Sequence, residues 1–202
     1  MEKERQKKEI LVVASANKNK LTEIESLLGR WYRIRPMGDF GIQDIEENGN
    51  SFEENAAIKA RLVMEHTGLP ALADDSGLEV DALQGAPGIY SARYCGEHGN
   101  DAANNELLLQ NLSGMKQPWT ARYVAAIALA RPGKQILVRL RTCEGKIVEK
   151  YRGSGGFGYD PLFLCELGKT FAEISLEEKN AISHRKRGIR AVLAALREEE
   201  ES

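Results

Sequence analysis

The sequence contains no apolar run near the roughly 20 residues that a membrane-spanning helix needs. It has only three cysteines, Cys95, Cys143 and Cys165, and no CxxC pair, which argues against a zinc knuckle or a disulfide framework. Neither sign of charge dominates, since 28 Lys and Arg face 30 Asp and Glu. A global electrostatic attraction to nucleic acid is therefore excluded, and we expect neither a nucleic acid nor a membrane as partner.

The composition is that of an ordinary globular protein. Hydrophobic residues make up 42% of the 202 residues and charged residues 29%, which excludes wholesale disorder and suits one domain or one two-lobed domain. Residues 1–9 are charged and lack the apolar core of a signal peptide. We therefore expect a charged extension over 1–9, a domain over 10–197, an acidic tail over 198–202, reduced cysteines and a cytoplasmic location.

The order of apolar segments predicts an α/β protein. Residues 10–14 form a short buried strand, a polar loop follows, and Leu21, Ile24, Leu27 and Leu28 then recur at helical spacing. Ser51 with Glu54 has the pattern of a helix-capping box. Further helices are predicted over 52–66, 101–112, 177–182 and 184–197, and further strands over 32–36 and 69–73.

A change of pattern after residue 119 indicates a mixed sheet. Extended runs over 120–130, 135–143 and 146–152 are separated by turn residues at 131–134 and at Glu144-Gly145, which predicts two hairpins. Antiparallel hairpins inside an α/β protein give a sheet that is partly parallel and partly antiparallel. We also expect the strand over 69–73 to end at Asp74 and Asp75, and another extended piece over 78–83.

The polar loop between the first strand and the first helix is one candidate ligand site. It consists of Ser15, Ala16, Asn17, Lys18, Asn19 and Lys20. Backbone N–H groups at a helix N-terminus lack intrahelical partners and carry partial positive charge, which suits a phosphate. The loop lacks the glycines of a Walker A motif. An ordinary polar turn with exposed lysines fits the spacing at least as well.

Carboxylates form a second candidate site. Asp74 and Asp75 follow an apolar strand, and Glu47 lies in a predicted loop over 38–50. In phosphate chemistry Mg²⁺ is commonly held by one or two carboxylates together with substrate phosphates. We favour such a site at Asp74 and Asp75 over an exposed Asp-Ser-Gly turn. For Glu47 the two interpretations are equally supported.

A glycine-rich loop is a third candidate. Four glycines between residues 153 and 158 let the backbone approach a ligand closely. Phe157 among them can stack on a flat base, and Asp160 can accept hydrogen bonds from ring N–H groups. The alternative is a loop whose aromatic residues fold back into the core, which is credible for Tyr159.

Basic residues near the C-terminus form the fourth candidate. Lys179, His184 and Arg185 offer hydrogen-bond donors that suit keto oxygens and phosphates. The alternative is an ordinary junction between two helices with Ser183 as the N-cap. Lys59 on the predicted helix over 52–66 is a further cation for this site, unless it is simply an exposed helix lysine.

Six segments together carry a family signature. They are Ser15-x-Asn17-x-x-Lys20, Phe52-x-x-Asn55-Ala-x-x-Lys59-Ala60, Ala73-Asp-Asp-Ser-Gly77, Gly85-Ala-Pro-Gly-Ile-Tyr-Ser-Ala-Arg93, Gly155-Gly-Phe-Gly-Tyr-Asp-Pro161 and Glu178-Lys-Asn-Ala-Ile-Ser-His-Arg185. Each segment is weak alone, but the ordered set is specific. On these segments the chain resembles the Ham1/RdgB family of noncanonical purine nucleoside triphosphate pyrophosphatases, the inosine and xanthosine triphosphatases.

The resemblance implies a mixed twisted β-sheet with flanking helices and a nucleotide cleft between two lobes. It implies a Mg²⁺-dependent homodimer that hydrolyses dITP, ITP and XTP to the monophosphate and pyrophosphate, which keeps deaminated purines out of nucleic acid precursors. Asp75 would be the catalytic residue and a metal ligand, with Glu47 as the second ligand. The loop over 15–20 would hold the triphosphate. The other residues expected at the substrate are Lys59, Ser76, Phe157, Gly158, Tyr159, Asp160, Lys179, His184 and Arg185.

The base and the reaction leave alternatives open. Donors such as His184 or Arg185 would pair with the 6-keto group of hypoxanthine and repel the amino group of adenine, but no residue explains the rejection of guanine. Asp74 is an alternative proton acceptor, or it neutralises a lysine. A related pyrophosphatase for modified or pyrimidine nucleotides, as in the similarly folded Maf group, is the second hypothesis. A nucleotide-binding sensor without turnover is the third, and the presence of Asp75 and Lys20 ranks it low.

Overall fold

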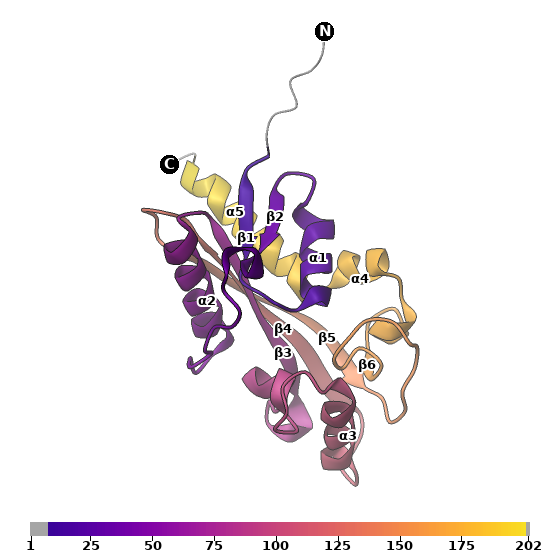
Figure 1. Cartoon of the computed structure of the whole chain (residues 1–202). Helices are drawn as coiled ribbons and strands as arrows, with labels where there is room; N and C mark the ends of the chain where they lie inside the picture. Colours follow the sequence, from indigo (N-terminus) through magenta and orange to yellow (C-terminus); the bar gives the residue numbers. More distant parts are fainter. Residues whose placement is uncertain (1–7, 201–202) are drawn as a thin grey trace.

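A six-stranded sheet organises the chain, in the order β2-β1-β3-β4-β5-β6 (Figure 1). The structure is a computed structural model that describes residues 8–200, so most of the predicted extension over 1–9 and the end of the predicted tail over 198–202 lie outside the described residues. The strands are β1 (Ile10–Val13), β2 (Arg33–Pro36), β3 (Ala71–Val80), β4 (Trp119–Ala130), β5 (Leu137–Ile147) and β6 (Phe163–Leu164). The helices are α1 (Lys18–Leu28), α2 (Phe52–Thr67), α3 (Asp101–Leu112), α4 (Leu176–Ile182) and α5 (His184–Glu200).

The sheet is mixed, as the sequence predicts. Strand β1 pairs in parallel with both β2 and β3, whereas β3, β4, β5 and β6 pair in antiparallel order. All five predicted helices are present. Helix α5 continues to Glu200, three residues past its predicted end, and Glu199 in the predicted tail pairs with Arg131.

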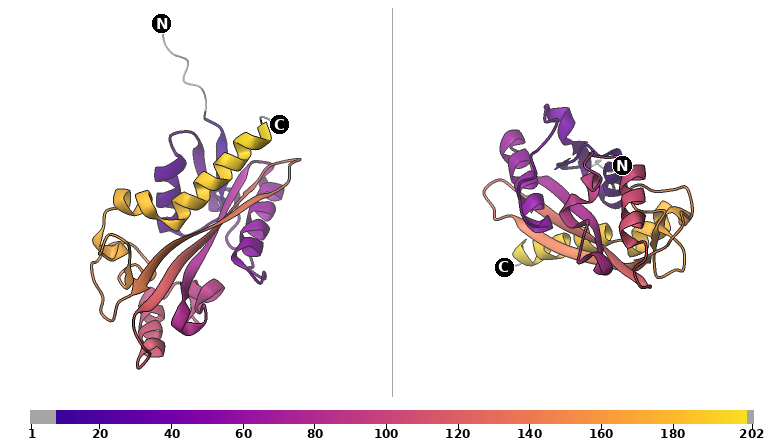
Figure 2. Two further views of the ribbon diagram at one scale, coloured as in Figure 1. Left: turned by 180° about the vertical axis from the view of Figure 1, so that it is seen from behind. Right: turned by 90° about the horizontal axis from the view of Figure 1, so that it is seen from below.

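Helices cover both faces of the sheet in its upper part, as drawn in Figure 1. Helix α2 packs on one face of β3 and β4, and α1 and α5 pack on the other (Figure 2). Side chains alternate between the two faces of a strand, so that Ala126 and Ala128 of β4 meet α2, while Ala125 and Ile127 meet the layer of α1 and α5. Small residues on the α2 side bring the helix close to the sheet.

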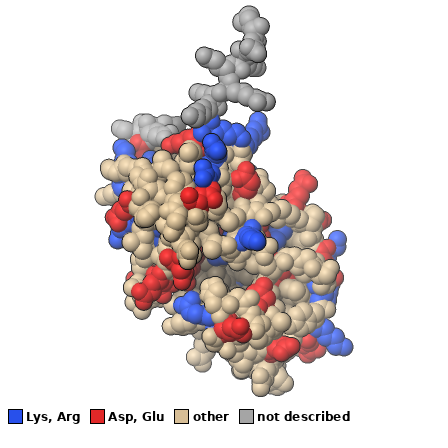
Figure 3. All heavy atoms as spheres, viewed as in Figure 1, with Lys and Arg blue, Asp and Glu red and all other residues tan. Residues whose placement is uncertain are grey.

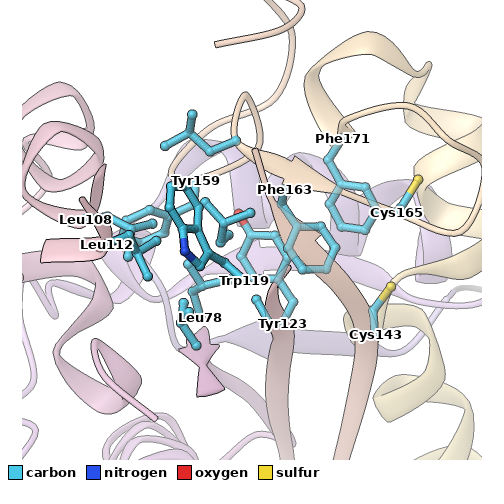
Figure 4. Close-up of a cluster of buried hydrophobic side chains, with 14 residues drawn as sticks. Leu78, Leu108, Leu112, Trp119, Tyr123, Cys143, Tyr159, Phe163, Cys165 and Phe171 are labelled. Atoms are coloured by element: carbon cyan, nitrogen blue, oxygen red, sulfur yellow. The ribbon is translucent and has the colours of Figure 1, made fainter. Parts of the chain in front are cut away.

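A second core lies at the lower ends of β3, β4 and β5, in the orientation of Figure 1. Tyr123 stacks on Phe171 with ring centroids 5.6 Å apart and contacts Phe163 at 4.6 Å (Figure 4). Leu108 and Leu112 of α3 close this core from the other side. Strands β3, β4 and β5 run through both cores, and this gives the molecule two lobes (Figure 1).

Strand β3 corrects the prediction of a short strand that ends at Asp74 and Asp75. It continues to Val80 and pairs with β4 along its whole length, so the extended piece predicted from residue 78 begins inside the same strand. The two carboxylates do not force a turn because cationic side chains meet both of them. Gly77 serves close packing, since a Cβ there would lie 2.5 Å from Ser91 Oγ.

Strand β5 corrects the prediction of a hairpin at Glu144 and Gly145. The strand passes straight through both residues, and the predicted separate strand over 146–152 contributes only its first two residues to β5. Gly145 leaves room for β6, which pairs with β5 beside this position, and a Cβ here would lie 2.5 Å from the ring of Phe163. The hairpin predicted at 131–134 is confirmed.

The cysteines and the lengths of the helices can be compared directly with the composition. All three cysteines are free, and burial raises the pKa of the Cys143 thiol to about 11, which makes it an inert core residue. Over residues 8–200, no helix combines the length and the apolar character required to span a bilayer.

Candidate active site

A cleft between the two lobes collects the four predicted segments. Figure 3 shows the hollow between the upper and the lower part of the molecule. The predicted site residues that line it are Ser15, Ala16, Asn17, Lys20, Glu47, Lys59, Asp75, Ser76, Phe157, Gly158, Tyr159, Asp160, Lys179, His184 and Arg185. Lys18 and Asn19 are the predicted residues outside this lining, and both side chains are exposed.

Asp74 is the centre of a buried ion-pair network. Its carboxylate lies 2.9 Å from Lys20 Nζ and 2.8 Å from Arg185 Nε, and it accepts a hydrogen bond from Ser76 Oγ. Burial disfavours the charge of this carboxylate. Arg185 and Lys20 outweigh that effect and hold the pKa of Asp74 well below its usual value. Asp74 therefore stays ionised and fixes two cations in place.

Asp75 has a different environment, although it is the next residue. Successive side chains of a strand point to opposite faces, and Asp75 lies on the α2 side, 2.8 Å from Lys59 Nζ. Burial raises the pKa of Asp75, because Lys59 and Lys20 only partly offset the desolvation and the nearby Glu47 adds to the rise. A carboxylate in a cleft with a raised pKa is suited to accept a proton.

Helix α2 positions the acidic side of the cleft. Ser51 Oγ caps the helix by accepting the N–H of Glu54, and the Glu54 carboxylate accepts the N–H of Asn50 rather than that of Ser51. One turn apart, Asn55 Oδ1 accepts the N–H of Gly49 at 2.8 Å and Lys59 Nζ donates to Glu47 at 2.7 Å. The loop over 41–50 has no regular structure, so these two contacts, together with a 3.4 Å ion pair between Glu47 and Arg93, hold Glu47 in place.

Glu47 and Asp75 are the residues that fit a divalent cation. Both carboxylates contact the same atom, Lys59 Nζ, so they converge from two directions on one point. Burial opposes the charge of Glu47, but Lys59 outweighs it and lowers the pKa of Glu47. Between residues 8 and 200 no group of three His, Cys, Asp or Glu side chains could hold a metal. Glu47 and Asp75 would supply two carboxylates, and further ligands would have to come from substrate or water.

The N-terminus of α1 is partly satisfied by its own cap. Asn17 Oδ1 accepts the N–H groups of Asn19 at 2.9 Å and Lys20 at 3.2 Å. These two amides are therefore engaged, although the sequence suggested them for a phosphate. Lys20 instead reaches into the cleft with its side chain and also donates to the carbonyl oxygen of Asp74 at 3.3 Å.

Asp160 anchors the glycine-rich loop from the inside. Its carboxylate accepts hydrogen bonds from Lys179 Nζ at 2.5 Å, from the Phe157 N–H at 2.9 Å and from Tyr123 Oη at 3.1 Å. Burial raises the pKa of Asp160, and Lys179 partly offsets this. With three donors on one buried carboxylate, the geometry gives Asp160 an anchoring role rather than the free acceptor expected for ring N–H groups.

The aromatic residues of this loop differ in exposure to the cleft. Phe157 lies with its ring centroid 4.7 Å from Lys179 Nζ, at the wall of the cleft. Tyr159 is buried, and its hydroxyl donates to the carbonyl oxygen of Ser91 at 2.8 Å. Tyr159 is therefore a core aromatic residue, which was the alternative interpretation, and it also lines the cleft.

His184 combines burial with an unused nitrogen. Its ring stacks on Tyr123, with centroids 4.9 Å apart, and among the described residues no hydrogen-bond partner meets its Nδ1. Burial, with the nearby Arg185, holds the pKa of His184 well below its usual value, so the ring is neutral. The alternative interpretation, a junction between two helices with Ser183 as the N-cap, is also confirmed, because Ser183 Oγ accepts the N–H of Lys186 between α4 and α5.

Glu23 is the residue that the sequence reasoning missed. It lies on α1, is 3% exposed, and pairs with both Lys179 and Arg185. Glu23 follows Lys20 by three residues, so it continues the same helix face, and this spacing was the available signal. Glu23 itself lies behind the cleft lining. The lining residues that were not predicted as site residues are Ala14, Met37, Asp44, Ile45, Gly77, Ile89, Ser91, Ala92, His98, Gly99, Asp101 and Tyr123.

Known proteins resemble this chain over most of its length. The model of the Ham1 family matches residues 11–195. The chain belongs to the Ham1 family. A dITP/XTP pyrophosphatase of Desulforamulus reducens is 48% identical over 190 residues, which cover 92% of this chain and 94% of the relative. A dITP/XTP pyrophosphatase of Syntrophobacter fumaroxidans is 52% identical over 183 residues, covering 89% of this chain and 78% of the relative.

Solved structures of the Ham1 family share the fold. A HAM1 protein from Coxiella burnetii superposes with a TM-score of 0.84 at 41% identity, covering 94% of this chain and 98% of that one. The Ham1 protein of Staphylococcus aureus gives a TM-score of 0.83 at 39% identity, with 94% and 99% covered. The predicted mixed sheet with flanking helices and the predicted family are thus confirmed.

Proposed function

We propose that the chain hydrolyses deaminated purine nucleoside triphosphates, namely dITP, ITP and XTP, to the nucleoside monophosphate and pyrophosphate. The observation that carries the proposal is a single cleft with two different ends. Lys20, Lys59 and Asp75, whose pKa is raised, line one end, and the ring of Phe157 forms a wall at the other. The names of the relatives, which are dITP/XTP pyrophosphatases at 48% and 52% identity, support the same substrate class.

Asp75 activates the attacking water in this proposal. Lys59 holds the carboxylate at 2.8 Å and so fixes its orientation, while the raised pKa of Asp75 makes it a stronger base than an ordinary aspartate. Burial lowers the pKa of Lys59, but its neighbours Asp75 and Glu47 outweigh this effect and raise the pKa, so Lys59 remains charged. Asp74 is the weaker candidate for this role, since its depressed pKa and its three partners keep it ionised and engaged.

The triphosphate lies against Lys20 and the loop over 15–20 in this proposal. Lys20 is fixed by Asp74, which places a full positive charge at the mouth of this loop. Fixed cations stabilise charge that develops on phosphate oxygens during attack. We include Mg²⁺ in the proposal, with Glu47 and Asp75 as the residues that would hold it, because both carboxylates line the cleft together with Lys20. When bound, it would supply charge neutralisation on the phosphates.

The base lies against Phe157. An aromatic ring offers a stacking surface that tolerates different bases, so selectivity requires polar groups. His184 is suited to this role because its neutral ring has an unused nitrogen in a buried place. Arg185 is less suited, since its guanidinium already donates to Asp74, Glu23 and Ser76.

The test is pyrophosphate release with Mg²⁺ from dITP, XTP, dGTP and dATP at equal concentration. The proposal predicts strong release from dITP and XTP and little from dGTP and dATP. Equal release from all four would keep the reaction and remove the base selectivity. Release from modified or pyrimidine nucleotides only would favour the Maf-type hypothesis. Tight binding of dITP without any release would favour the nucleotide sensor.

A homodimer and a cytoplasmic location complete the proposal. The homodimer follows from the resemblance to the Ham1/RdgB family. The location follows from the proposed substrates, which are nucleotide precursors. Sedimentation velocity of the purified chain tests the dimer, and a single monomer-sized species across the micromolar range would refute it.

A further inference from the structure

Helix α3 holds the loop that carries Phe157. Asp101 Oδ2 accepts the N–H of Gly158 at 2.7 Å, and Asn105 Nδ2 donates to the carbonyl oxygen of Gly158 at 2.9 Å. The two side chains are four residues apart, so they project from one face of the helix, one turn from each other. Both polar groups of Gly158 are thus bound by a helix that the sequence analysis did not connect with the cleft.

We propose that Asp101 and Asn105 are positioning residues that set how tightly the base is bound. We call the pair the α3 clamp. The inference rests on the proposed function and extends it to two residues that do not contact the reacting phosphates. Asp101 lines the cleft itself, whereas Asn105 is 2% exposed and acts through Gly158.

The local backbone explains why such a clamp is needed. Phe157 stands between Gly156 and Gly158, which have φ of +73° and +61°, and no strand ladder supports this part of the loop. Glycines allow these left-handed conformations but do not enforce them. Asp160 holds the N–H of Phe157 from the inside, and the α3 clamp holds Gly158 from the outside.

The clamp is mounted on a rigid support. Leu108 and Leu112 bury the helix in the lower core, and Asn104 Oδ1 accepts the N–H of Cys95. Fixing Phe157 before the nucleotide arrives removes an entropic cost from binding, while the proton transfer at Asp75 is unaffected. The α3 clamp should therefore act on KM and leave kcat almost unchanged.

The experiment compares four variants with the parent enzyme, using dITP. Asp101→Ala and Asn105→Leu should each raise KM about tenfold with kcat within about twofold, the size expected when one such hydrogen bond is lost. Asp101→Asn keeps an acceptor oxygen for Gly158 and should restore KM to near the parent value. Glu106→Ala is the matched control, because Glu106 is exposed on the same helix, and it should leave both constants unchanged.

A second readout separates this inference from the proposed function. Amide hydrogen exchange of the segment over 154–161 in the ligand-free chain should be faster in Asp101→Ala than in the parent and in Glu106→Ala. An active parent whose KM is unchanged by Asp101→Ala and by Asn105→Leu would overturn the inference and leave the function intact. An inactive parent would refute the function alone. Hydrogen exchange that is unchanged in Asp101→Ala and in Asn105→Leu would still refute the α3 clamp.

Discussion

The two ends of the cleft are built by different means. At the Asp75 end, Asp75 lies on β3 and Lys59 on α2, and ion pairs between 2.7 and 2.9 Å link the two aspartates of β3 and Glu47 of the loop over 41–50 to lysines. At the Phe157 end, the aromatic ring lies on an irregular loop that depends on Asp160 and on α3 for its position. A regular element thus carries the proposed general base, and an irregular loop held by hydrogen bonds carries the proposed base contact.

The difference indicates how the two ends can vary. A side chain on a paired strand is placed by the backbone ladder, so a change at Asp75 should alter the chemistry without moving its neighbours. A side chain on a braced loop depends on several contacts, so distant changes should act on it. The following predictions test this contrast, from the largest expected effect to the smallest.

Asp75→Asn should give the largest loss of activity. The substitution keeps the shape of the side chain and removes its basicity, and losing a general base typically costs 10²–10⁴ in rate, so we expect kcat to fall about 1,000-fold. The fold should remain, with a Tm within about 2 °C of the parent, because burial already disfavours the charge at this position. Steady-state pyrophosphate release and a thermal melt measure the two effects, and near-normal turnover would reject Asp75 as the proton acceptor.

Asp74→Asn makes the same chemical change at the neighbouring residue and should mainly reduce stability. Removing one member of a buried ion-pair network leaves Arg185 and Lys20 with a lost partner, which costs about 3 kcal/mol. For a chain of this length that corresponds to a Tm lowered by about 10 °C. If Asp74→Asn instead abolished turnover at an unchanged Tm, the roles of the two aspartates would have to be exchanged.

The pH dependence should separate the same two residues. A general base must be ionised, and the pKa of Asp75 is raised in the chain without Mg²⁺, so kcat/KM, which reports the free enzyme, should fall while the pH is still above the ordinary aspartate value of 3.8. The pKa of Asp74 is depressed, so its stabilising effect is fully present above that value and is lost only as the pH falls through the lower, folded-state pKa. The raised pKa of Asp75 works in the opposite sense, because its ionisation costs some stability as the pH rises.

The measurement is a pair of profiles between about pH 4 and pH 8, one of kcat/KM for dITP and one of Tm. Activity should decline at a higher pH than stability. If both declined together, acid unfolding rather than the titration of Asp75 would explain the loss of activity.

Periodicity and capping residues predicted most of the fold. Ser51 and Gly68 mark the ends of α2, and the apolar spacing places α1 and α5 within a few residues of their observed bounds. The two wrong predictions, a strand end at Asp74 and Asp75 and a hairpin at Glu144 and Gly145, share a cause. Gly77 and Gly145 resemble turn residues in sequence, but each permits another part of the chain to pass close by, and that requirement depends on contacts between distant segments.

The candidate site was predictable where a residue type has few structural explanations. Two adjacent aspartates after an apolar strand need partners, and the structure supplies Lys20 and Lys59. The sequence could not assign separate roles to Asp74 and Asp75, because their difference comes from the two faces of β3. Glu23 and Asp101 were missed for a similar reason, since their importance depends on α1 and α3 meeting segments more than 50 residues away.

Phe157→Ala should have the smallest of these effects and should fall on binding. Stacking of one base on an aromatic ring contributes about 1–3 kcal/mol, so KM for dITP should rise about tenfold while kcat stays within about twofold. Tyr151→Ala is the matched control, since Tyr151 is an aromatic residue that precedes the glycine-rich loop and lies outside the cleft lining, and it should leave KM unchanged. An unchanged KM in Phe157→Ala would count against stacking. A large loss of kcat would show that the loop also places the triphosphate, and the contrast between the two ends of the cleft would then be too simple.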